Sequence, residues 1–319
     1  MQTISMILPY FLCGKGEWPS YIDWHMASCK ANDTIDFYIF TDDTSISKWE
    51  EVPNIHIVYM TFDECVELIK TQLGDVKIST PYKLCDYRPA YGIIFEQWIG
   101  NSDFWGFYDC DLIYGDMRHY FTDELLSQYD KLMILGHTQL YRNTEEVNNF
   151  FRLERPEDSK YRDYTWQKVS QDEKHYGFDE WTGAPQLIKE NNKRIFWERE
   201  NFSNIYQPAN YKRVFDKNVG MNSLFQVWQW KDGKMFHINR MNKKKTERMY
   251  IHLTQRKMKA EVYEGQTEAY ITQKSEIKTF IGRGDSFTGV EFFALYLKKI
   301  FQWVKWHITH LKGKKNWEM

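Results

Sequence analysis

The chain has 319 residues, enough for one large domain or two, and its net charge of −2 argues against a general nucleic-acid binder, whose affinity depends on neutralising phosphates. Its five cysteines are odd in number and form no Cys-x-x-Cys pair, which is typical of reduced thiols in the cytoplasm. No basic segment precedes the first apolar stretch, so we identify no secretory signal there.

The N-terminal segment predicts a strand over residues 3–11, a helix over 18–30 and a strand over 36–41. This order implies two parallel strands joined by a right-handed crossover. Pro9, Tyr10 and Asp42 would then emerge at one edge of the sheet, where the base and ribose of a nucleotide could be held.

A third strand over residues 55–60 is followed by Thr61 and Glu64, whose spacing predicts a capping box at the start of a helix. Residues 82–98 predict a further helix, although Pro89 lies within it.

Lys83 and Asp86 are three residues apart and lie on one face of that predicted helix. There they could reach a diphosphate or order metal-binding aspartates. The alternative is a helical ion pair worth only about a few tenths of a kcal/mol.

An aromatic run from Phe104 to Tyr108 predicts a buried strand that ends in Asp109 and Asp111. In an extended chain, residues two apart project to the same side, so the two carboxylates would converge and Cys110 would face the opposite way. Such hard oxygen ligands suit Mn²⁺ or Mg²⁺. The alternative is a pair of turn-capping aspartates.

These features together resemble a known family. The resemblance is carried by Asp109-x-Asp111, by residues 7–11 (Ile-Leu-Pro-Tyr-Phe), by residues 39–42 (Ile-Phe-Thr-Asp), and by the polar and basic stretches 79–92 and 136–143. Over residues 1–255 their order is similar to that of GT-A-type glycosyltransferases, and especially to a bacterial family associated with capsule and other surface-polysaccharide biosynthesis.

The resemblance implies an α/β fold with a GT-A-like, Rossmann-type mixed sheet flanked by helices. It implies a UDP-sugar as donor and a glycan or lipid-linked oligosaccharide as acceptor. It also suggests that Asp42 and Asp109 contribute to binding the nucleotide sugar. For Asp42 a role as a turn or N-cap residue is an equal alternative.

After the acidic strand, the sequence predicts a helix over residues 122–129, a strand over 131–136, a helix over 144–152 and a mobile surface region over 154–174. Asp179 and Glu180 are predicted to start a helix that runs to about residue 191. Their simplest explanation is the attraction of a carboxylate to the positive end of a helix. By resemblance, either residue is a candidate catalytic base or acceptor-binding group.

Residues 226–238 predict a β-hairpin with Asp232 and Gly233 at its turn. The strand that follows ends in His252, with Arg256 and Lys257 close behind. By resemblance, His252 completes the metal site with Asp109 and Asp111, and the two cations bind the diphosphate. The glycine common between such residues in other families is replaced here by Gln255 and Arg256.

We therefore expect a catalytic domain over residues 1–257, a short strand or linker extension over 258–288, and a basic amphipathic helix over 289–319. Apolar residues recur at helical spacing in the last segment, and its lysines make it too polar to span a bilayer. A helix of this kind suits an anionic membrane surface, which would place the protein at the inner face of the cell membrane. The alternative is a helix docked on the catalytic domain or on a second subunit.

The sequence thus predicts a metal-dependent transferase of nucleotide-activated sugars. One alternative is a non-catalytic protein that binds nucleotides or carbohydrates, since a fold does not establish an activity. Another is a nucleotidyltransferase, although residues 14–16 (Gly-Lys-Gly) only poorly match the glycine-rich loop of that class.

Overall fold

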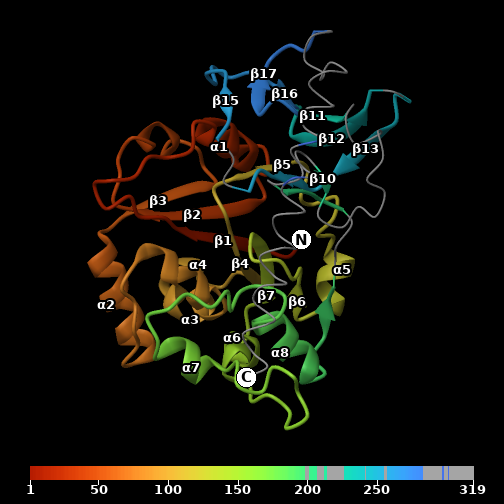
Figure 1. The fold of residues 1–319 in the computed structure, drawn as a ribbon. Helices are drawn as coiled ribbons and strands as arrows, with labels where there is room; N and C mark the ends of the chain where they lie inside the picture. Colours follow the sequence, from red (N-terminus) through yellow and green to blue (C-terminus); the bar gives the residue numbers. More distant parts are fainter. Residues whose placement is uncertain are drawn as a thin grey trace.

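The computed structural model describes residues 1–197, 201–206, 212–213, 226–240, 242–254 and 257–282, together with Leu297 and Phe301. At its centre lies a seven-stranded mixed sheet (Figure 1). The strand order is β3 (Ile55–Tyr59), β2 (Ile35–Thr41), β1 (Ile4–Pro9), β4 (Phe104–Tyr108), β7 (Thr138–Arg142), β6 (Lys131–Leu132) and β8 (Ile195–Phe196). The first four strands are parallel and β7 is antiparallel to β4, which confirms the predicted mixed α/β architecture.

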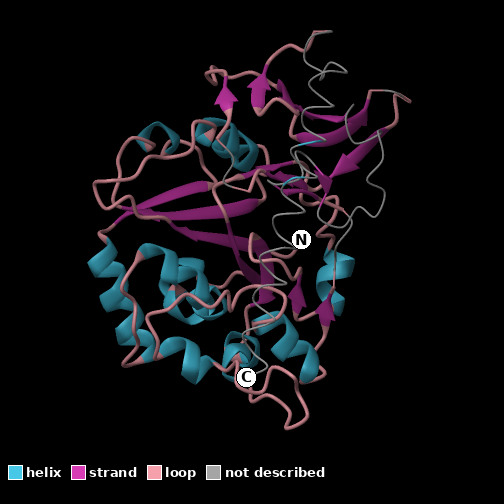
Figure 2. Cartoon of the chain, viewed as in Figure 1, coloured by secondary structure: helices cyan, strands magenta, loops and turns pink. Residues whose placement is uncertain are grey.

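Both faces of this sheet are covered, because alternate side chains of its central strands enter two separate hydrophobic cores. In β1, Met6 and Leu8 pack in one core and Ile7 in the other. Figure 2 shows most helices below the sheet and α1 above it. The helical segments are α1 (Ile22–Lys30), η1 (Ser47–Trp49), α2 (Phe62–Leu73), η2 (Pro81–Ala90), α3 (Tyr91–Ile94), α4 (Glu96–Ile99), α5 (Asp123–Gln128), α6 (Glu145–Asn148), η3 (Phe150–Arg152), α7 (Trp166–Ser170) and α8 (Ala184–Glu190).

The predicted capping box at the start of α2 is confirmed, since the Thr61 side chain accepts from Glu64 N and the Glu64 side chain accepts from Thr61 N. The single helix predicted over 82–98 is wrong. Pro89 lacks the N–H that an α-helix needs and clashes with the preceding turn, and the chain instead forms η2, α3 and α4 in succession.

The later part of the chain adds two further sheets. The predicted hairpin is confirmed, and Asp232 (φ 48°) and Gly233 (φ 75°) both adopt the left-handed conformation that a type I′ turn requires. One sheet has the order β10 (Lys212–Arg213), β9 (Ser203–Tyr206), β14 (Tyr250–His252), β5 (Leu112–Tyr114). The other has the order β13 (Lys245–Arg248), β12 (Lys234–Asn239), β11 (Gln226–Lys231), β16 (Glu268–Thr272), β17 (Glu276–Lys278), β15 (Lys259–Ala260).

The six-stranded sheet corrects one predicted boundary. It joins β11–β13, which precede residue 257, to β15–β17, which follow it, so this residue does not separate two structural units. The helix predicted over 289–319 lies outside the described residues, apart from Leu297 and Phe301. Within the described parts of the chain, no helix has the length and apolar character needed to cross a bilayer.

Helix α1 fixes the position of β5 through polar side chains. β5 pairs with β14 along one edge. Toward α1, His25 Nδ1 lies 2.7 Å from Leu112 O, Tyr114 N donates to Ser28 Oγ, and Asn32 Nδ2 donates to Gly115 O. On the edge of β5 that pairs with no strand among the described residues, these contacts satisfy backbone groups and fix the position of the residues directly after Asp111.

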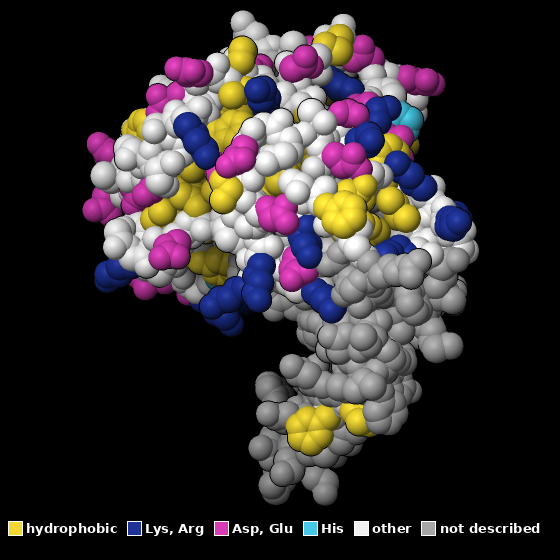
Figure 3. Space-filling view, turned by 90° about the horizontal axis from the view of Figure 1, so that it is seen from above, with side chains coloured by type: hydrophobic (Ala, Val, Ile, Leu, Met, Phe, Trp, Pro, Cys, Tyr) yellow, Lys and Arg dark blue, Asp and Glu magenta, His cyan; other side chains and the backbone are white. Residues whose placement is uncertain are grey.

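On the face seen in Figure 3, acidic and basic side chains are interspersed over the described surface. This mixture of charges is in keeping with the net charge of −2.

Candidate functional site

Asp109, Cys110 and Asp111 form a turn between β4 and β5. The extended geometry expected for them is therefore wrong, because the chain leaves one sheet at β4 and enters another at β5. Backbone hydrogen bonds fix both sides of the turn: Asp109 N donates to His137 O (3.0 Å) and Leu253 N donates to Asp111 O (2.9 Å). Cys110 is buried, as expected.

The pairing of β14 with β5 brings His252 to this turn. His252 is the register partner of Leu112, and its Nε2 lies 3.2 Å from Asp111 Oδ1. Candidate ligand atoms of Asp109, Asp111 and His252 all lie within 4.8 Å of one another. Burial lowers the pKa of the His252 imidazole, but Asp111, Asp109 and Glu180 together outweigh burial and raise that pKa.

Arg88 connects this acidic turn to a second carboxylate. Its guanidinium forms ion pairs with Asp109 and with Asp179 (2.8 Å), and it also donates to Gly136 O. Arg88 lies in one of the stretches that carry the family resemblance, but no role for it was predicted from the sequence. The only local signal is its position two residues after Asp86.

Asp179 and Glu180 lie in a turn, and α8 begins only at Ala184, so the predicted helix start at these residues is wrong. Asp179 is buried, whereas Glu180 is exposed and accepts from Gly136 N (3.2 Å). Burial raises the pKa of Asp179 to about 8, although Arg88 opposes this shift. A Cβ at position 136 would lie 2.8 Å from oxygens of both acids, so a side chain there would displace these two carboxylates.

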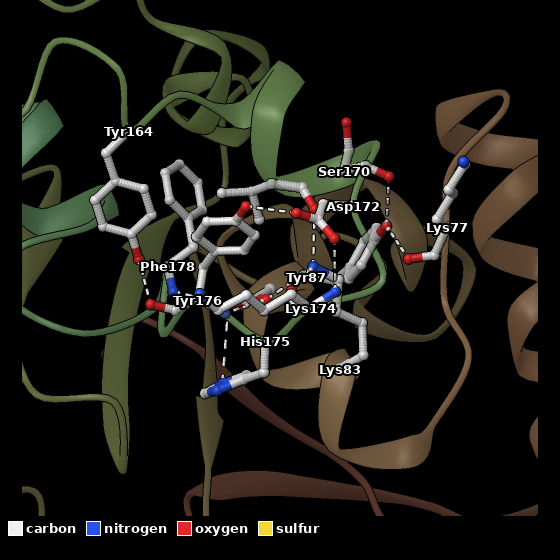
Figure 4. A network of polar contacts seen from close by, with 12 residues as sticks. Lys77, Lys83, Tyr87, Tyr164, Ser170, Asp172, Lys174, His175, Tyr176 and Phe178 are labelled. Carbon is white, nitrogen blue, oxygen red and sulfur yellow. Dashed lines mark hydrogen bonds and ion pairs between the residues drawn. The ribbon is translucent and has the colours of Figure 1, made fainter.

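Lys83 and Asp86 form a buried ion pair, which favours the ion-pair alternative over the predicted contact with a diphosphate. Lys83 and Asp86 are 1% and 0% exposed. The ammonium group of Lys83 donates to Asp86 (3.0 Å) and to the carbonyl oxygens of Val169 (2.8 Å) and Lys174 (2.7 Å), which uses all three of its protons (Figure 4).

Asp86 in turn accepts hydrogen bonds from the backbone N–H groups of Tyr176 and Phe178. The pair therefore fixes the segment that leads into Asp179. The region predicted to be a mobile surface over 154–174 contains α7, and Trp166 and Val169 within it belong to the hydrophobic core.

The residues predicted to hold the nucleotide differ in their distance from the acidic turn and in their contacts. Pro9 is the register partner of Phe40, and Tyr10 stacks on Trp18 with ring centroids 4.5 Å apart. Burial raises the pKa of Tyr10, as do Cys110, Asp111 and Asp109, so its hydroxyl faces the acidic turn.

The carboxylate of Asp42 accepts from Leu12 N and Cys13 N, each at 2.7 Å, which favours the turn-stabilising alternative. Lys257 is exposed, and Arg256 lies outside the described residues.

His137 is a further residue of the site. It directly precedes β7, and because β7 pairs with β4 it lies opposite Asp109. Its ring stacks on that of His252 (centroids 4.3 Å apart), yet neither of its nitrogens has a hydrogen-bond partner. Two carboxylates, an imidazole and a buried, unpartnered imidazole beside them fit a divalent cation.

The profile of the Family of unknown function (DUF6625) matches residues 6–280, so the chain belongs to this family. No curated protein matches the chain.

Similar solved structures include mouse xyloside xylosyltransferase 1 in its apo form (8% identity, 65% of this chain and 88% of that chain, TM-score 0.39). They also include the galactosyltransferase LgtC with donor and acceptor sugar analogues (11%, 78% and 86%, TM-score 0.39) and the bifunctional glycosyltransferase WbbM in its apo form (8%, 79% and 46%, TM-score 0.40).

Proposed function

We propose that the protein is a metal-dependent glycosyltransferase that uses a nucleotide diphosphate sugar, specifically a UDP-sugar, as donor. The observation that carries this proposal is the convergence of Asp109, Asp111 and His252 beyond the C-terminal end of β4. In open α/β sheets this is the edge at which nucleotides bind. The acceptor is a glycan or lipid-linked oligosaccharide of bacterial surface-polysaccharide synthesis.

Asp109, Asp111 and His252 would hold Mn²⁺ or Mg²⁺. The bound cation would neutralise the charge that develops on the departing diphosphate. Lys257 and Arg256 follow His252 in the chain and would add positive charge on the same side. Tyr10, next to the acidic turn, would contact the nucleotide, with Pro9 and Asp42 shaping the loop around it.

Glu180 is the better candidate for the base that deprotonates the acceptor hydroxyl. It is exposed, whereas Asp179 is buried and paired with Arg88. Asp179 would act with Arg88 to fix the position of Asp109. A base needs only to reach the acceptor hydroxyl within hydrogen-bond distance, which an exposed side chain can do.

Product analysis with a panel of nucleotide sugars, with and without Mn²⁺, tests this proposal. We expect transfer or slow hydrolysis of one donor, loss of that activity on chelation, and its return with Mn²⁺. Binding without turnover would favour the non-catalytic alternative, and release of diphosphate from a nucleoside triphosphate would favour a nucleotidyltransferase.

A further inference from the structure

We propose that His137 is a second imidazole ligand of the cation site and that it makes the site prefer a first-row transition ion such as Mn²⁺ over Mg²⁺. This inference rests on the proposed function, which places a cation between Asp109, Asp111 and His252.

The placement of His137 is fixed by the main sheet. Its carbonyl oxygen accepts from Asp109 N (3.0 Å), and its ring lies against His252 at 4.3 Å between centroids and 30° between planes. His137 therefore contacts two of the three residues that would hold the cation.

The residues around His137 are mostly aromatic and offer no hydrogen-bond partner to its ring nitrogens. The side chain is 4% exposed, its other ring neighbours are Phe202 (5.5 Å) and Tyr250 (5.4 Å), and neither Nδ1 nor Nε2 has a hydrogen-bond partner. Leaving a buried polar group unpartnered destabilises a fold, so such a group calls for a partner that the protein alone does not supply.

His25 provides the contrast within the same protein. It is equally buried, but its Nδ1 lies 2.7 Å from Leu112 O and its Nε2 lies 3.6 Å from Cys29 Sγ. Both nitrogens of His25 have a partner within the fold, whereas neither nitrogen of His137 does, although its ring stacks on that of His252.

The geometry permits joint ligation. Neighbouring ligands of an octahedral ion lie roughly 3 Å apart when metal–ligand bonds are about 2.1 Å. The candidate ligand atoms within reach of one another belong to Asp109, Asp111 and His252, so His137, whose ring centroid lies 4.3 Å from that of His252, would join them by a rotation of its side chain when the cation binds. Mg²⁺ is a hard ion that binds oxygen ligands and gives up its waters reluctantly, so a second imidazole disfavours Mg²⁺ relative to a first-row transition ion such as Mn²⁺.

The test uses the full-length protein, MnCl₂ as the only added ion, and the variant His137→Phe. Phenylalanine keeps a ring that can pack on His252, Phe202 and Tyr250 but removes both nitrogens. Electron paramagnetic resonance measures Mn²⁺ affinity, and pulsed measurements of nitrogen coupling count the imidazole ligands. His252→Phe is the companion variant.

We expect two coupled nitrogens in the wild type, one in His137→Phe, and a roughly tenfold loss of Mn²⁺ affinity with little change for Mg²⁺. A single coupled nitrogen in the wild type and an unchanged Mn²⁺ affinity in His137→Phe would overturn the inference that His137 is a ligand. If His252→Phe then still lost Mn²⁺ binding, the proposed cation site of Asp109, Asp111 and His252 would stand without His137. No Mn²⁺ binding by the wild type would overturn both.

Discussion

Two groups of buried charged residues include members of the same segment, η2. They differ in whether each charge is balanced by a partner within the protein. The closed cluster consists of Lys83, Asp86 and the backbone of residues 174–178, and every proton of the lysine has an acceptor. The acidic cluster consists of Arg88, Asp109, Asp111, Asp179 and His252.

The acidic cluster has three carboxyl side chains, one arginine and one histidine, and the side chain of Asp109 is 27% exposed. Burial and the neighbouring Asp111 raise the pKa of Asp109 to about 6, although Arg88 opposes them. In the closed cluster, the charge of Lys83 is balanced by the carboxylate of Asp86. In the acidic cluster, the carboxyl groups lie close enough together to favour the binding of a cation.

The largest effect should follow from Asp111→Asn. We expect Mn²⁺-dependent turnover to fall by roughly a thousandfold, because a ligand of the cation is lost. The free energy of unfolding should change little, because the exchange removes a like charge beside Asp109 and also the charged contact between Asp111 and His252, two effects of opposite sign. Turnover assays and chemical denaturation measure both effects, and Asp116→Asn in the same segment is the control. Undiminished turnover would reject the assignment of Asp111.

The closed cluster should respond in the opposite way. Asp86→Ala leaves Lys83 buried without its carboxylate, and we expect a loss of about 3–5 kcal/mol in the free energy of unfolding. Glu67→Ala is a matched control, because Glu67 and Lys70 form an exposed ion pair with the same three-residue spacing.

Denaturation curves should show a loss of less than about 1 kcal/mol for Glu67→Ala. Equal losses for Asp86→Ala and Glu67→Ala would show that the closed cluster does not stabilise the fold more than an exposed ion pair does.

A smaller, selective effect is expected from Glu180→Gln. Transfer to the acceptor should fall about a hundredfold, while nucleotide binding and donor hydrolysis change much less, because the base acts on the acceptor. Glutamine retains an oxygen that can accept from Gly136 N. Equal, small changes in all three measurements would contradict a role as base.

The smallest effect concerns residues 289–319. Truncation before Gly289 should abolish flotation with anionic liposomes but preserve activity on a soluble acceptor analogue. Each basic residue near such a surface contributes about 1 kcal/mol, so attachment should be weak and sensitive to salt. Unfolding of the truncated protein, or failure of the full-length chain to bind liposomes at low salt, would instead place the segment against protein.

The sequence predicted what depends on local pattern. The strands of the N-terminal half, the capping box of Thr61 and the hairpin at Asp232 each follow from residue type and spacing, and each is present. Asp109 and Asp111 could be selected because they directly follow a strong strand signal.

Arg88 and His137 could not be assigned a role, because their positions depend on contacts between distant segments. His137 meets Asp109 only through the pairing of β7 with β4. Lys83 and Asp86 were misjudged for a related reason: their spacing predicts a shared helical face, but it does not show that segment 174–178 covers them. Local spacing alone does not show whether charged residues will be covered, as in the closed cluster, or will remain partly exposed, as in the acidic cluster.

The most direct test of the cation site is anomalous X-ray scattering at the manganese edge from crystals soaked in MnCl₂ and UDP. We predict one strong peak within about 2.0–2.6 Å of ligand atoms from Asp109, Asp111 and His252. A manganese peak bound elsewhere, or none at this turn when UDP is bound, would contradict the central claim.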